Sequence, residues 1–131
     1  DLVNVASIAK PSYSSPVTAN ASINYDQPLA GDLKLFARVG YTYEARKNSF
    51  PLILTSPFAD RVKADPRNLI DAQIGLGGIR FAGSETQVKF WVKNLTNSHD
   101  VARGIDFGQL GYAGIIYADP RTFGADVTLK F

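Results

Sequence analysis

Apolar and polar residues alternate with a period of two along much of this chain. In residues 33–45 every odd position is apolar, whereas the even positions are mostly polar or charged. Successive side chains of a β-strand point to opposite faces of a sheet, so this pattern predicts a strand with one apolar and one polar face. Four other segments repeat it, and we expect strands over about 17–26, 33–45, 68–81, 86–95 and 121–131.

The apolar faces of these five segments carry no charged residue and no amide. The opposite faces carry few large hydrophobes, namely Phe36, Leu69 and Trp91. Strands of globular proteins average about 5–6 residues, whereas a tilted membrane-spanning strand needs about 9–11. The lengths of the segments and their uninterrupted apolar faces favour the transmembrane strands of an outer-membrane β-barrel.

Short and long connections alternate between the expected strands. Residues 27–32 and 82–85 are short turns, whereas about 46–68 and 94–121 are long connections. Compact soluble domains rarely contain structureless connections of more than about 12–15 residues, but outer-membrane barrels combine short periplasmic turns with long extracellular loops. We therefore expect an all-β fold, an antiparallel meander of about five long transmembrane strands with Phe131 at the periplasmic rim.

Aromatic residues and a pair of glycines add detail to this arrangement. The apolar residues before Gly77-Gly78 have even numbers and those after it have odd numbers, so we expect a β-bulge there. Aromatic side chains fall near both ends of the apolar faces, where barrels have aromatic girdles. They are Tyr25 and Phe131 at one end, and Tyr41, Tyr43 and Phe123 at the other.

Composition excludes several classes of protein. The formal net charge of +2 gives no reason to expect nucleic acid or another polyanion as a partner. Cysteine is absent, which excludes disulfides and thiolate metal sites. No run approaches the roughly 18 apolar residues of a transmembrane helix. Because the chain lacks both an initiator Met and a signal-peptide pattern at its start, we expect a processed protein or a piece of a longer one.

Four motifs occur along the chain, and their order carries a resemblance to a known family. The closing stretch has Pro120-Arg121 followed by an aromatic and a glycine, and it ends on Phe131. Residues 90–97 (FWVKNLTN) form a strand that runs into Asn-Leu-Thr. Residues 25–29 (YDQPL) open a hairpin that continues over 33–43, and residues 104–108 (GIDFG) precede Leu-Gly-Tyr at 110–112. Over about residues 16–131, the chain resembles the last strands of TonB-dependent outer-membrane receptors.

This resemblance implies that residues 1–131 are the C-terminal part of a 22-stranded barrel, with residues 1–16 as a loop or preceding segment. Such barrels are plugged by an N-terminal domain. The family takes up scarce ligands such as siderophore-bound iron, cobalamin or oligosaccharides, with energy delivered by TonB, ExbB and ExbD through a part that this chain lacks. The resemblance places the protein in the outer membrane of a Gram-negative bacterium. Outer-membrane lipid and the barrel assembly machinery are then its partners.

Site residues follow partly from the resemblance and partly from residue type. Val127, Leu129 and Phe131 resemble the C-terminal signal that the barrel assembly machinery binds as an added strand. A set of inward-facing charges is expected to line the lumen or to face the plug, and we favour buried ion pairs in the lumen as their role. These residues are Lys34, Arg38, Lys89, Lys93, Lys130, Asp71 and Asp126. Residues of the long connections that could contact a ligand are Arg61, Lys63, His99, Asp100, Arg103, Asp106, Tyr112 and Tyr117.

Catalysis and cofactor binding find no support in the sequence. There is no Ser–His–Asp set and no carboxylate pair that suggests catalysis. We therefore expect a protein that is not an enzyme and has no cofactor. His99 beside Asp100 does not make a metal site, because three or four ligands are needed. Two other interpretations remain open: a small outer-membrane barrel with a structural or porin-like role, and a soluble all-β binding module.

Overall fold

The structure, a computed structural model, describes residues 4, 6, 9–50, 57–81 and 83–131. The described chain is all-β and divides into two compact units. One, which we call the sheet unit, comprises Asn20–Thr42, Asn68–Ser98 and Pro120–Phe131. The other, the loop unit, comprises the described residues of Asp1–Ala19, Tyr43–Arg67 and His99–Asp119.

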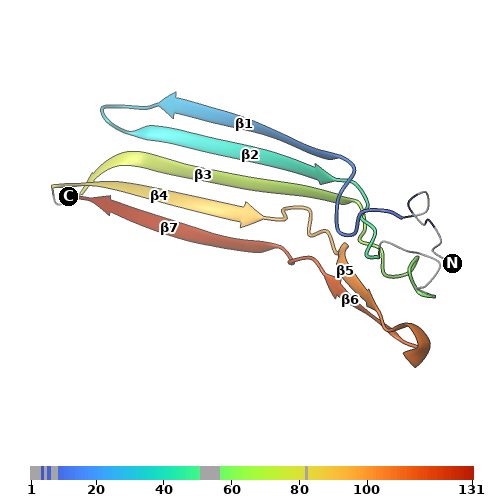
Figure 1. Cartoon of the computed structure of the whole chain (residues 1–131). Helices are drawn as coiled ribbons and strands as arrows, with labels where there is room; N and C mark the ends of the chain where they lie inside the picture. The colour runs from blue at the N-terminus through green and yellow to red at the C-terminus, as the bar shows by residue number, and fades with distance from the viewer. Residues whose placement is uncertain (1–3, 5, 7–8, 51–56, 82) are drawn as a thin grey trace. The chain divides into compact units, whose positions relative to one another are not determined.

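A five-stranded sheet contains most of the strand residues (Figure 1). Its strands lie in the order β1-β2-β3-β4-β7, so each strand pairs with the next long strand along the chain. The expected antiparallel arrangement is confirmed for the pairs β3–β4 and β4–β7. The strands are β1 Thr18–Pro28, β2 Lys34–Glu44, β3 Arg67–Phe81, β4 Ser84–Lys93 and β7 Thr122–Lys130.

The register of the sheet places apolar residues opposite apolar residues. Phe90 of β4 lies between Ile74 of β3 and Ala125 of β7, and Val88 lies between Leu76 and Val127. Polar and charged residues form the alternate rows, as in the pairing of Gln87 with Thr128. Because neighbouring side chains in a strand point to opposite faces, the sheet has one apolar and one polar face. The alternation in the sequence thus predicted the two faces correctly.

The apolar face is not covered by any described residue of the chain. Ile23 is 76% exposed, Phe90 is 59% exposed and Phe123 is 80% exposed. In contrast, the buried hydrophobic residues of the described chain are Ala59, Val62 and Ala64, all of them in the loop unit. The sheet unit therefore has large apolar side chains but no hydrophobic core of its own.

A β-bulge interrupts β3 at the glycine pair, as the change of parity predicts. The register between β3 and β4 shifts between Leu76 and Ile79. Gly78 has a φ of +74°, a conformation that side chains with a Cβ rarely adopt. A Cβ atom added to Gly78 would also overlap with the carbonyl oxygen of Asp32, in the turn between β1 and β2. The bulge therefore requires glycine for both its conformation and its packing.

Two aromatic residues on the polar face lie against glycines of neighbouring strands. The ring of Phe36 occupies the space where Gly75 would carry a Cβ atom, and the indole of Trp91 does the same at Gly124. Trp91 and Gly124 are direct cross-strand partners in the β4–β7 register. Phe36 and Trp91 are large hydrophobic residues on an otherwise polar face. Their rings cover the backbone that the neighbouring glycines leave exposed.

The connection between β4 and β7 is not structureless, so that expectation was wrong for its central part. It contains a two-stranded antiparallel sheet made of β5 (Val101–Asp106) and β6 (Ala113–Tyr117). A short 3₁₀ helix, η2 (Gly108–Leu110), joins the two strands. Phe107 and Tyr112 stack across the tip with ring centroids 4.6 Å apart.

Among the described residues, no helix has the length and apolar character needed to cross a membrane.

Candidate functional site

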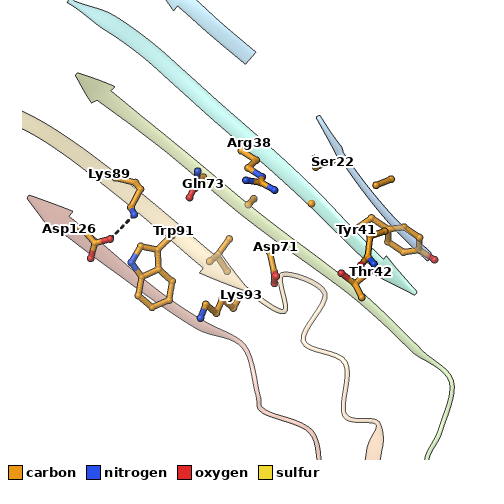
Figure 2. A pocket seen from close by; sticks show the side chains of 15 residues that line it. Ser22, Arg38, Tyr41, Thr42, Asp71, Gln73, Lys89, Trp91, Lys93 and Asp126 are labelled. Atoms are coloured by element: carbon orange, nitrogen blue, oxygen red, sulfur yellow. Dashed lines mark ion pairs between the residues drawn. The ribbon is translucent and has the colours of Figure 1, made fainter. Parts of the chain in front are cut away.

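The polar face of the sheet unit contains a recess of about 800 Å³ (Figure 2). The alternation along the strands explains why polar residues gather there. Every second residue of each of the five strands faces the same side of the sheet. Its charged lining residues are Arg38, Asp71, Lys89, Lys93 and Asp126, and its aromatic lining residues are Tyr41 and Trp91. The recess is open to solvent in the described chain, and it offers both cations and carboxylates.

One cross-strand ion pair lies in this recess. The ammonium group of Lys89 is 2.9 Å from a carboxylate oxygen of Asp126, and the two residues are direct partners in the β4–β7 register. Both side chains are partly exposed to solvent, which screens their attraction, so the pair contributes little to stability. Lys89 and Asp126, two of the charges expected to form ion pairs, are therefore paired, and their position in a lumen stays a prediction.

The other charges of the recess have different contacts. The carboxylate of Asp71 accepts a hydrogen bond of 2.9 Å from the backbone N–H of Asn94, which fixes the end of β4 against β3. The ammonium of Lys93 lies 5.8 Å from the ring centroid of Trp91, a cation–π distance. Arg38 forms no ion pair within the described residues. The recess thus presents Arg38 and Lys93 as cations that no carboxylate of the described chain neutralises.

All eight residues suggested as ligand contacts lie in the loop unit. Asp106 has a structural role there, because one carboxylate oxygen accepts the N–H of Phe58 and the other accepts the N–H of Gly108, both at 2.7 Å. Lys63 forms an ion pair with Asp60. The pKa of the exposed Asp60 carboxyl lies below its ordinary value. The hydrogen bond from Lys63 is the main cause, and the positive charge of Lys63 is the second.

Two of the eight residues have aromatic neighbours. The guanidinium of Arg103 lies 5.7 Å from the ring centroid of Tyr13, and Tyr112 stacks on Phe107. Arg61, His99 and Tyr117 are exposed, and the half-buried Asp100 accepts a backbone hydrogen bond from Ala118. No group of three or more His, Cys, Asp or Glu side chains that could hold a metal ion occurs in the described part of the chain. Ligand contact by these residues stays a prediction.

Reasoning from the sequence missed the residues that hold the loop unit together. Tyr13 donates a hydrogen bond from its hydroxyl to the carbonyl of Gly104, which is 91 positions away in the chain. Asp65 binds Val101 through both its backbone and its carboxylate. Neither contact has a signal in the spacing of residues, because each depends on how separate connections meet in space.

The residues of the expected assembly signal lie on the apolar face and are exposed. Val127 and Leu129 belong to β7, and Phe131 follows it directly. β7 is also an edge of the sheet in the described chain, so one side of its backbone has no neighbouring strand. An exposed edge of this kind is suited to pairing with another strand.

Two features therefore define the surface of the sheet unit: an exposed apolar face, and a polar face with a charged recess. The loop unit adds a third, a separate set of exposed aromatic and charged residues. No protein-family model, curated protein or solved structure matches this chain.

Proposed function

We propose that this chain forms part of the wall of an outer-membrane β-barrel, with its apolar face against lipid and its polar face toward the lumen. The observation that carries this proposal is the exposed apolar face, which crosses all five strands of the sheet. Covering one large hydrophobic side chain stabilises a protein by about 1.5–3 kcal/mol. A face with this many exposed hydrophobes is therefore expected to find an apolar partner, since large contiguous apolar patches mark interaction surfaces.

Strand length favours lipid over a second protein sheet as that partner. The five strands have 11, 11, 15, 10 and 9 residues. Strands of a soluble sandwich average about 5–6 residues, whereas a tilted strand needs about 9–11 to cross the hydrocarbon core. The soluble binding module and the small structural barrel are the alternatives, and the first of them conflicts with these lengths.

For the whole protein, we propose a TonB-dependent receptor that imports a scarce ligand such as a siderophore complex, cobalamin or an oligosaccharide. Support comes from the order of the motifs in residues 16–131, above all Pro120-Arg121 directly before β7 and Phe131 directly after it. In this proposal the recess faces the lumen and the long connections face outward. The Lys89–Asp126 pair then lies inside the barrel, where water and polar groups solvate it.

A pair of neighbouring substitutions tests the orientation of the two faces. Ile74 lies on the apolar face and Gln73 lies next to it on the polar face. In a lipid-embedded barrel, Ile74→Lys should destabilise the protein by about 2–4 kcal/mol, because a charge then enters the hydrocarbon layer. Gln73→Lys places the same side chain in the polar recess and should cost less than about 1 kcal/mol.

Both variants are made in the whole parent protein, and unfolding by denaturant is followed in lipid vesicles. Equal costs for the two variants, or a larger cost for Gln73→Lys, would refute the assignment of the faces. The receptor function has a separate test. The parent gene is deleted, and ligand uptake is measured together with growth on medium in which that ligand is the single source of the nutrient. Loss of both supports the receptor function, and normal uptake contradicts it.

A further inference from the structure

Three connections that are far apart in the sequence meet in the loop unit. They are the described residues of the segment before β1, of the connection between β2 and β3, and of the connection between β4 and β7. Tyr13 of the first connection contacts both of the others. Its backbone N–H donates to the carbonyl of Asn48 at 2.8 Å, and its hydroxyl donates to the carbonyl of Gly104 at 3.0 Å. The guanidinium of Arg103 also lies over its ring.

The second and third connections are joined to each other independently of Tyr13. The backbone N–H of Asp65 donates to the carbonyl of Val101 at 2.9 Å, and the carboxylate of Asp65 accepts the N–H of Val101 at 3.0 Å. Further along, the carboxylate of Asp106 accepts the N–H of Phe58 at 2.7 Å. These bonds link the two connections at two separate points.

A small core lies where the connections meet. Val62 is only 1% exposed, and its backbone carbonyl accepts a hydrogen bond from the hydroxyl of Ser49. Gly104 of β5 packs so closely on Val62 that an added Cβ atom would overlap with it. Ala59 and Ala64 are buried in the same connection. Because β5 covers Val62, moving the hairpin away would expose this core to water.

We propose that the three connections open and close as one cooperative unit, which Tyr13 joins by bridging the first connection to the other two. Since each connection supplies hydrogen-bond partners for another, none can leave without breaking bonds in its neighbours. This inference stands whether or not the proposed transport function is correct.

Hydrogen exchange of the full chain in detergent tests this proposal, with Tyr13→Phe as the variant. This change removes one hydroxyl and keeps the ring that Arg103 covers. The backbone amides of Ala64 and Asp65 serve as reporters, since their hydrogen bonds go to Lys47 and Val101 and not to Tyr13. In a cooperative unit they should exchange about fivefold faster, the factor expected for losing one hydrogen bond of about 1 kcal/mol.

Tyr112→Phe is the matched control, because the Tyr112 hydroxyl forms no hydrogen bond within the described residues. It should leave exchange at Ala64 and Asp65 unchanged, and both variants should leave the amides of β4 and β7 unchanged. Faster exchange confined to the amides next to Tyr13 or Gly104 overturns the proposal. So does equally faster exchange in β4 and β7, which would reveal general unfolding instead of a separate unit.

A second variant approaches the same unit from the opposite side. Gly104→Ala forces a Cβ atom into Val62. In a cooperative unit it should speed exchange at the Ala45 amide, whose hydrogen bond goes to the carbonyl of Val17 and not to Gly104 or Tyr13. An unchanged Ala45 amide in a variant that retains slow exchange in β4 and β7 contradicts cooperative opening.

Discussion

Gly78 illustrates how a single residue determines the path of the sheet. Its φ is +74°, and an added Cβ atom would overlap with the carbonyl oxygen of Asp32. Gly31 also has a positive φ, +66°, but an added Cβ there would meet no atom within 4 Å. The two glycines therefore separate the cost of backbone conformation from the cost of a clash.

Alanine substitutions at these glycines should differ in stability. Gly31→Ala should lower the free energy of unfolding by about 1–2 kcal/mol, the cost of the left-handed conformation. Gly78→Ala should cost about 1–3 kcal/mol more, because the backbone around Asp32 must also move. Denaturant unfolding in detergent measures both values. Equal losses for the two variants would show that Gly78 and Asp32 are not in close contact.

At the same scale, the sequence predicted some residues well and others not at all. The change of parity at Gly77-Gly78 predicted the bulge, because a strand shows its two faces directly in the spacing of its residues. The role of Tyr13 left no such trace. Its hydroxyl binds Gly104 across 91 positions, and only the meeting of two connections in space creates that contact.

At the scale of the elements, the long strands follow from the sequence, and the β5–β6 hairpin does not. The long strands show a period of two, broken only by the change of parity at Gly77-Gly78 in β3, and few other structures produce such a pattern. The hairpin instead depends on Asp106, whose carboxylate accepts the Gly108 N–H, and on the stacking of Phe107 on Tyr112. The choice of ligand-contact residues has the same weakness. Residue type alone does not reveal that the Asp106 carboxylate already accepts a hydrogen bond from Phe58.

The end of β7 yields a prediction about assembly. Phe131 is fully exposed and follows a strand that is an edge of the sheet. If the assembly machinery binds this edge, deleting Phe131 from the parent protein should lower its amount in the outer membrane. Phe131→Tyr keeps an aromatic ring and should assemble at close to the normal level. Immunoblots of outer-membrane fractions measure both, and normal assembly of the deletion variant would contradict the role of Phe131.

At the scale of the whole molecule, the sheet is open between β1 and β7 in the described chain. In lipid, the unpaired backbone groups of these edges would cost several kcal/mol each unless further strands cover them. β1 and β7 are the first and fifth strands of a meander, and they run in the same direction. Closing such a sheet into an all-antiparallel barrel requires an odd number of additional strands.

The central claim is that one face of the sheet lies against an apolar phase. Trp91 is the single tryptophan of the chain and faces the polar recess, while its neighbour Phe90 is exposed on the apolar face. Quenching of tryptophan fluorescence by a brominated detergent reports contact with the apolar phase. The double variant Phe90→Trp/Trp91→Phe moves the fluorophore from one face to the other by a single position.

Folded chains are compared in brominated and unbrominated detergent of the same chain length. We predict weak quenching of Trp91 in the natural sequence and strong quenching of the tryptophan at position 90, because only the latter side chain contacts the detergent tails. Equal quenching at the two positions, or stronger quenching of Trp91, would contradict the assignment of a lipid-facing apolar surface.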